Sequence, residues 1–73
     1  MIKIKETVWK NSKRDYIDMS PKMKAFLNDL ISVCQRHQLS ISHEDHHGAF
    51  EINEYSDYDM QWILNAHDDI TEN

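Results

Sequence analysis

Apolar side chains between residues 20 and 38 recur every three or four positions, which is the spacing of one face of an α-helix. Ser20 and Pro21 stand directly before this pattern. Serine accepts hydrogen bonds from the free amides of a first turn. Proline at the first helical position sacrifices no hydrogen bond, because an amide there has no partner within the helix. The pattern predicts a helix over residues 21–37, with a buried stripe made of Met23, Phe26, Leu27, Leu30, Ile31 and Cys34.

Two short alternations with a period of two follow this helix. Leu39 and Ile41 alternate with serines, and Phe50 and Ile52 alternate with polar residues. Strands that are covered on one face only show this pattern. Gly48 permits the positive φ that a tight connection requires. We therefore expect an antiparallel β-hairpin over residues 39–53, covered on its apolar face.

A second helical pattern begins after residue 55. Ser56 is a suitable N-cap, and Asp57 and Asp59 favour the positive end of a helix. Met60, Ile63, Leu64 and His67 then follow at helical spacing, so a helix is expected over residues 57–67. The remaining residues, 69–73, are expected to form an acidic tail that frays.

The first nineteen residues differ from the rest of the chain. Ile2 and Ile4 alternate with lysines, which predicts a strand, and residues 10–19 are polar and predict a loop. The sequence thus divides into a basic N-terminal arm of strand plus loop (1–19), an α-β-β-α domain (20–68) and the tail. The fold expected is α+β, a small antiparallel sheet packed by two helices. The hairpin forms that sheet alone or with the N-terminal strand as its third member.

The charge of the chain is unevenly spread. Residues 1–24 carry seven basic and three acidic side chains, a charge of +4, whereas residues 25–73 carry one basic and ten acidic side chains, a charge of −9. An acidic surface repels nucleic acid and attracts basic protein surfaces, so direct nucleic-acid binding is not expected. The alternative is that the basic arm packs on the acidic body and the charges compensate.

Length and cysteine content narrow the class of protein. A chain of 73 residues forms one domain and buries only about 60% of its unfolded surface, so a thin core is expected. Its single cysteine, Cys34, has no internal disulfide partner, which fits a reducing compartment. No apolar run approaches the roughly 18 residues of a membrane helix, and residues 1–5 do not resemble the core of a signal peptide. We expect a cytoplasmic protein without membrane contact.

The first candidate site is the cluster at the hairpin turn, which comprises His43, Glu44, Asp45, His46 and His47. Imidazole and carboxylate groups bind divalent metals and exchange protons near neutral pH. Cys34 and His37 add a superficial zinc pattern, but too few residues separate His37 from His43 to build a zinc finger. A solvated turn whose histidines form local hydrogen bonds is the alternative. Alternation also places His43 on the same face as Leu39, where it would pack against a helix.

The second candidate site is aromatic. Tyr58 and Trp62 are four residues apart on the second helix and share a face, and tyrosine and tryptophan are common at interface hot spots. They either complete the thin core or form a partly exposed patch, with an acidic rim, that docks a partner or a second copy. The sequence leaves both a monomer and a homodimer open.

Catalysis is not expected from this sequence. No serine stands in a nucleophile elbow, and so short a chain has little material for the concave, water-excluding pocket that an active site requires. We therefore expect neither catalytic residues nor a cofactor. A weak hydrolase that uses His43 and Glu44 remains the enzymatic alternative.

A resemblance to other proteins runs from about residue 25 to residue 68. It is carried by Phe-Leu-Asn-Asp at 26–29, by residues 34–45 with their Ser-His-Glu-Asp end, by His-Gly-Ala-Phe-Glu-Ile at 47–52 and by Trp-Ile-Leu-Asn-Ala-His-Asp at 62–68. In these residues the chain resembles a group of small uncharacterised proteins of bacteriophages and prophages. The basic N-terminal arm lies outside the resemblance.

The resemblance implies an accessory phage protein that acts in the bacterial cytoplasm by binding a host protein, such as a defence or replication component. With the acidic and aromatic residues above, it leads to the hypothesis of a non-enzymatic protein that blocks its partner sterically or electrostatically. The alternative hypothesis is a module that sequesters a metal or small ligand at the His/acid turn.

Overall fold

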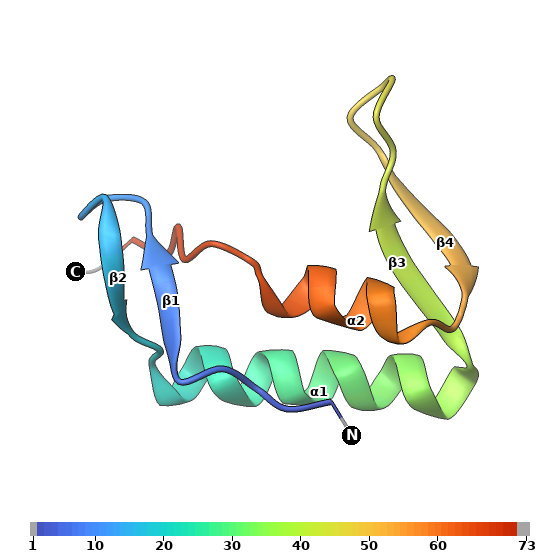
Figure 1. Ribbon diagram of the computed structural model, residues 1–73, viewed down its shortest axis with the longest axis horizontal. Helices are drawn as coiled ribbons and strands as arrows, with labels where there is room; N and C mark the ends of the chain where they lie inside the picture. The colour runs from blue at the N-terminus through green and yellow to red at the C-terminus, as the bar shows by residue number, and fades with distance from the viewer. Residues whose placement is uncertain (1, 72–73) are drawn as a thin grey trace.

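The computed structural model describes residues 2–71 and confirms a small α+β fold (Figure 1). Two helices lie side by side, and a two-stranded antiparallel sheet stands at each end of them. No helix in the described part of the chain is long and apolar enough to cross a membrane. The elements in order are β1 (Thr7–Lys10), β2 (Asp15–Asp18), α1 (Pro21–His37), β3 (Leu39–His43), β4 (Phe50–Glu54) and α2 (Asp57–Leu64).

Helix α1 has the bounds that the sequence predicts. The Ser20 hydroxyl accepts a hydrogen bond from the Met23 amide at 3.2 Å, which satisfies one of the free donors of the first turn. At the other end, Gln38 adopts the left-handed conformation (φ 57°) and its amide donates to the last carbonyls of the helix. This C-cap turns the chain sharply into β3, because the left-handed residue ends the helical path.

Helix α2 starts as predicted and ends three residues earlier. The Ser56 hydroxyl caps it by accepting from the Asp59 amide at 3.1 Å. After Leu64 the chain leaves the helix, and the ring of His67 comes to lie 6.1 Å from the ring of Trp9. The expected continuation to residue 67 is wrong because tertiary contacts with β1 draw these residues away.

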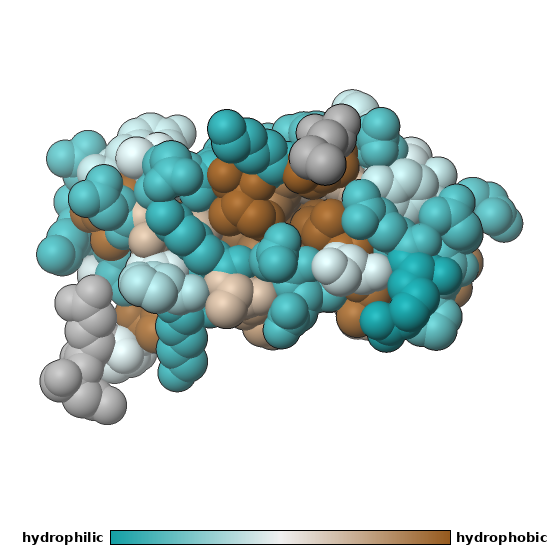
Figure 2. Space-filling view, turned by 90° about the horizontal axis from the view of Figure 1, so that it is seen from below, coloured by the Kyte–Doolittle hydropathy of each residue, from teal (hydrophilic) through white to brown (hydrophobic). Residues whose placement is uncertain are grey.

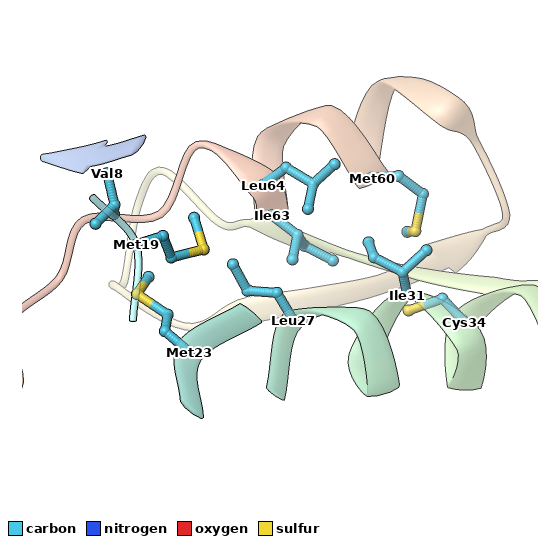
Figure 3. Packing of buried hydrophobic residues seen from close by; sticks show 9 residues of the cluster. All are labelled: Val8, Met19, Met23, Leu27, Ile31, Cys34, Met60, Ile63 and Leu64. Atoms are coloured by element: carbon cyan, nitrogen blue, oxygen red, sulfur yellow. The ribbon is translucent and has the colours of Figure 1, made fainter. Parts of the chain in front are cut away.

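The core lies between the two helices (Figure 3). One stripe of α1 faces one stripe of α2, and side chains from β1 and from the segment before α1 close one end of the seam. Phe26, expected in this stripe, is instead 63% exposed, because the buried face of α1 is narrower than its apolar face. The buried apolar residues are Val8, Met19, Met23, Leu27, Ile31, Cys34, Met60, Ile63 and Leu64.

The N-terminal region differs from the prediction. The residues expected to form a loop contain β2, which pairs with β1 so that Thr7 faces Asp18 and Lys10 faces Asp15. This hairpin is separate from the β3–β4 hairpin, so β1 is not a third strand of the same sheet. Residues 2–5 do not form the predicted strand. They form an extended segment, and its Ile2 and Ile4 side chains pack on the core.

Residues 68–70 are bound to the fold rather than frayed. The Asp68 amide donates to the Trp9 carbonyl at 2.7 Å, and the Asn11 amide donates to the Asp68 carbonyl at 3.0 Å. The ammonium of Lys10, only 2% exposed, donates to the Asp68 carboxylate at 3.0 Å and to the Ile70 carbonyl at 2.6 Å. The expectation that the acidic tail frays from residue 69 onward is therefore wrong for residues 69–70, while residues 72–73 lie outside the described part.

The Asp68 carboxylate is held in its charged form. The hydrogen bond from the Ile70 amide lowers the pKa of Asp68 most, the Lys10 ammonium lowers it further, and burial opposes both. An ion pair this enclosed is costly to break from one side, because the remaining charge stays buried without its partner.

Lys10→Met removes that ammonium and leaves the charge of Asp68 uncompensated. We expect the thermal unfolding midpoint to fall and the amides of residues 68–70 to exchange faster with solvent. Lys13→Met, in the exposed turn between β1 and β2, is the control and should change neither quantity. Equal midpoints for the two variants would show that the ion pair does not hold the C-terminal segment.

Candidate functional site

The β3–β4 hairpin has one polar and one apolar face. Its strands pair in the register Leu39–Glu54, Ser40–Asn53, Ile41–Ile52, Ser42–Glu51 and His43–Phe50. Residues directly opposite in an antiparallel pair point to the same side of the sheet. One face therefore carries Ser40, Ser42, Glu51 and Asn53, and the other carries Leu39, Ile41, His43, Phe50, Ile52 and Glu54.

The polar face is the one that the rest of the molecule covers. The fully buried Ser40 hydroxyl donates to the Glu54 carbonyl at 3.1 Å and accepts from the Ser56 amide at 2.8 Å. The Asn53 amide donates to the Ser42 hydroxyl at 2.7 Å and lies 3.4 Å from the buried Asp59 carboxylate. These bonds seat the hairpin on the start of α2. The prediction that the apolar face would be covered is wrong for most of the hairpin.

The apolar face of the hairpin is turned outward. Phe50 and Ile52 are 65% and 66% exposed, and Leu39 is 44% exposed. Ile41 is the exception, because it is half-buried against the core. Figure 1 shows the hairpin extending beyond the helices, so that its tip has no other element beside it.

Two grooves continue this surface along α1. One lies between α1 and the hairpin and is lined mainly by apolar side chains, including Val33, Leu39 and Ile52. The other lies between α1 and α2 and includes Phe26 and Trp62. Both grooves include Leu30 and Ile41, so they form one continuous strip. We call this surface the groove strip, to distinguish it from the apolar face of the hairpin. It comprises Phe26, Leu30, Val33, Leu39, Ile41, Ile52 and Trp62.

Hydrophobic atoms also reach the surface on the α1 side of the molecule. Figure 2 shows them near the middle of this side, with hydrophilic side chains around them. Isolated exposed apolar residues are common in soluble proteins, but a contiguous patch with a polar rim marks an interaction surface.

The predicted His/acid cluster forms the tip of the hairpin. The Glu44 carboxylate accepts hydrogen bonds from the His46 amide at 2.6 Å and from the His47 amide at 2.5 Å. These bonds hold the backbone of the turn in place. His43 Nδ1 lies 3.0 Å from the Asp45 carboxylate, and His47 Nδ1 lies 3.4 Å from that of Glu44. The expectation that His43 packs against a helix is wrong, because its side chain is 55% exposed.

These contacts bear on the chemistry expected at the tip. Within residues 2–71 no group of three or more His, Cys, Asp or Glu side chains converges in a way that could hold a metal ion. The imidazoles and carboxylates instead make pairwise contacts within an exposed turn. Cys34 is buried, and burial, with a smaller effect of the Asp59 charge, raises the pKa of its thiol above 9.0. A protonated, enclosed thiol is a poor nucleophile and a poor ligand.

The predicted aromatic pair is exposed and lies elsewhere on the molecule. Tyr58 is 83% exposed and Trp62 44% exposed, and Trp62 belongs to the groove strip. Of its expected acidic rim, Asp59 is buried beneath the hairpin. The structure thus joins Trp62 to Phe26 and Ile41 rather than to the His/acid tip.

Sequence reasoning missed Phe26, Val33, Phe50 and Ile52 as surface residues. For α1 a signal exists in the sequence. Its apolar positions cover more than one stripe, since Phe26, Leu30 and Val33 lie beside the buried Met23 and Leu27. For the hairpin no such signal exists, because alternation shows two faces without showing which one is covered.

Comparisons of the chain with protein-family models, curated proteins and solved structures gave no match.

The Ser40 hydroxyl should be the main determinant of how the hairpin is seated. Ser40→Ala leaves the Ser56 amide and one Glu54 lone pair without their partner, and we expect a loss of about 1–3 kcal/mol in the free energy of unfolding. Chemical denaturation measures this loss. The control Ser32→Ala, on the exposed side of α1, should change stability by less than about 0.5 kcal/mol. Equal stability of the two variants would contradict the role given to Ser40.

The hairpin tip should open in acid. The His46 amide is the main cause that lowers the pKa of Glu44 below its ordinary value of 4.5; partial burial opposes it and the His47 amide adds to it. A lowered folded-state pKa means that stabilisation is complete above about 4.5 and is lost as pH falls through the folded value. The protection of the His46 and His47 amides, measured as their exchange relative to the intrinsic rate at each pH, should fall over that interval. Glu44→Gln should abolish the pH dependence, and its persistence would contradict the assignment.

Proposed function

We propose that this chain is a non-enzymatic protein-binding protein that docks a partner through the outward apolar side of its β3–β4 hairpin. The observation that carries the proposal is the orientation of the hairpin. Its polar residues are seated on α2, while Phe50 and Ile52 are about two-thirds exposed on a part of the chain that extends beyond the helices. Exposed apolar surface of this kind is unfavourable in water unless a partner covers it.

The surroundings of this surface favour a basic partner. Glu44 and Asp45 stand at the tip, Glu51 and Glu54 follow on β4, and Asp57 begins α2, all without a lysine or arginine among them. Opposite charge across an interface speeds association and selects the partner. Tyr58 and Trp62 extend the surface onto α2 with the residue types that anchor interfaces.

The resemblance of residues 25–68 to small uncharacterised phage and prophage proteins implies an accessory role, and we infer from it that the partner is a bacterial host protein. In this proposal the chain acts by steric or electrostatic blocking of a basic surface on the host protein. The alternative of a metal- or ligand-binding module at the His/acid tip gains no support from the pairwise contacts found there.

Phe50→Ser together with Ile52→Ser should weaken partner binding at least about tenfold, because each truncation removes apolar contact worth on the order of 1 kcal/mol or more. A partner captured from bacterial lysate by the wild-type protein would be purified, and its affinity for each variant measured by calorimetry. Tyr16→Ser is the matched control, since Tyr16 is 66% exposed on β2 at the other end of the molecule. Wild-type affinity of the double variant would refute the proposal.

A further inference from the structure

The two flanks of α1 are covered unequally. On one flank the N-terminal segment runs alongside the helix, tied down by the Glu6–Lys24 ion pair at 2.9 Å and by the partly buried Ile2 and Ile4 (Figure 1). On the other flank Phe26 and Val33 are 63% and 42% exposed, and each lines one of the two apolar grooves described above. In residues 2–71 no segment covers this second flank.

The exposed apolar area is large for so small a molecule. Six side chains from this flank and the surfaces beside it (Phe26, Val33, Leu39, Ile52, Trp62 and Ile70) are each 42–66% exposed. At about 150–250 Å² for a whole large side chain, they expose on the order of 600 Å². That value is at the upper end of the roughly 300–600 Å² of the largest patch on a monomer. It is also most of the about 800 Å² that each partner buries in a standard interface.

The charges along this flank complement one another under a two-fold axis. Asp29 and Arg36 lie seven residues apart, so they stand two helical turns, about 10.5 Å, from each other on the stripe of Phe26 and Val33. Neither side chain has an ion-pair partner among the described residues. When a second α1 lies antiparallel with the axis midway between Asp29 and Arg36, each Asp29 faces the other copy's Arg36. The same axis brings Phe26 of each copy toward Leu39 of the other.

We propose that the chain forms a two-fold homodimer in which this flank of α1 packs antiparallel on the same flank of a second copy. In a two-fold interface each contact occurs twice, so the Asp29–Arg36 contact between the two copies forms once on each side of the axis. The inference goes beyond the proposed function and does not depend on it. Phe50 and the hairpin tip lie outside the interface, so the dimer presents two hairpins. It therefore binds with increased avidity to a partner that carries two copies of the recognised surface.

Sedimentation equilibrium of the untagged protein from about 1 µM to about 1 mM tests the assembly over the range of weak to moderate complexes. The expected result is a species of twice the 8.7 kDa chain mass whose fraction rises with concentration. A monomer throughout this range would overturn the proposal, and would leave the flank to a different protein.

Charge reversal tests the antiparallel arrangement. Asp29→Arg and Arg36→Asp should each raise the dimer dissociation constant at least about tenfold, because two attractive pairs become two repulsive ones. The double variant should restore dimerisation to within about threefold of wild type. Asn28→Arg, an exposed position one residue off the stripe, is the control and should leave the constant unchanged. A double variant as weak as the single ones, or single variants as tight as the control, would overturn the arrangement.

Val33→Glu separates this inference from the proposed function. It should give a monomer that still binds one partner through the hairpin. At a concentration low enough for the wild type to be monomeric as well, the two proteins should share one thermal midpoint, because Val33 is exposed in the single chain. A Val33→Glu protein that remains dimeric would contradict the interface. Phe50→Ser alone, at a position outside the interface, should lose partner affinity and remain dimeric, so its outcome concerns only the proposed function.

Discussion

The arrangement of this molecule depends on the hydroxyl of Ser40. It is completely buried and joins three elements, since it lies on β3, donates to a carbonyl of β4 and accepts from the amide that precedes α2. A buried hydroxyl must satisfy its hydrogen bonds inside the fold, so the side of the hairpin that carries Ser40 must face α2. Because side chains alternate along a strand, the opposite side must then face away from it.

The remainder of the fold supports this geometry from the other end. Helices α1 and α2 share a thin core, and the chain ends close it, with Ile2 and Ile4 along one flank and residues 68–70 beside β1. The buried Lys10–Asp68 pair joins positions far apart in the sequence. A domain of this size has little apolar surface to bury and is marginally stable, so the loss of one partner of this buried pair is a large fraction of its stability.

A thin core and an outward apolar surface have a common origin. The chain has more large apolar side chains than two short helices can enclose, so Phe26, Val33, Phe50 and Ile52 remain in contact with water. These residues lie in two regions, one on the projecting hairpin and one along α1. The first suits a basic partner and the second suits a copy of the same chain, since only the second region carries charges that complement themselves. The two regions adjoin at Leu39, Ile52 and Trp62, whereas Phe50 and the hairpin tip belong to the first region alone.

The sequence by itself determined the local structure wherever a periodic pattern coincided with a cap. Ser20, Pro21 and Ser56 set the helix starts, and Gly48 (φ +72°) closes the hairpin turn. Only the tertiary structure decided which face of the hairpin is covered, because an alternating strand is compatible with burial on either side. It also decided that residues 15–18 pair with β1 and that Asp68 joins Lys10. These contacts connect segments whose own patterns are too short or too polar to indicate a partner.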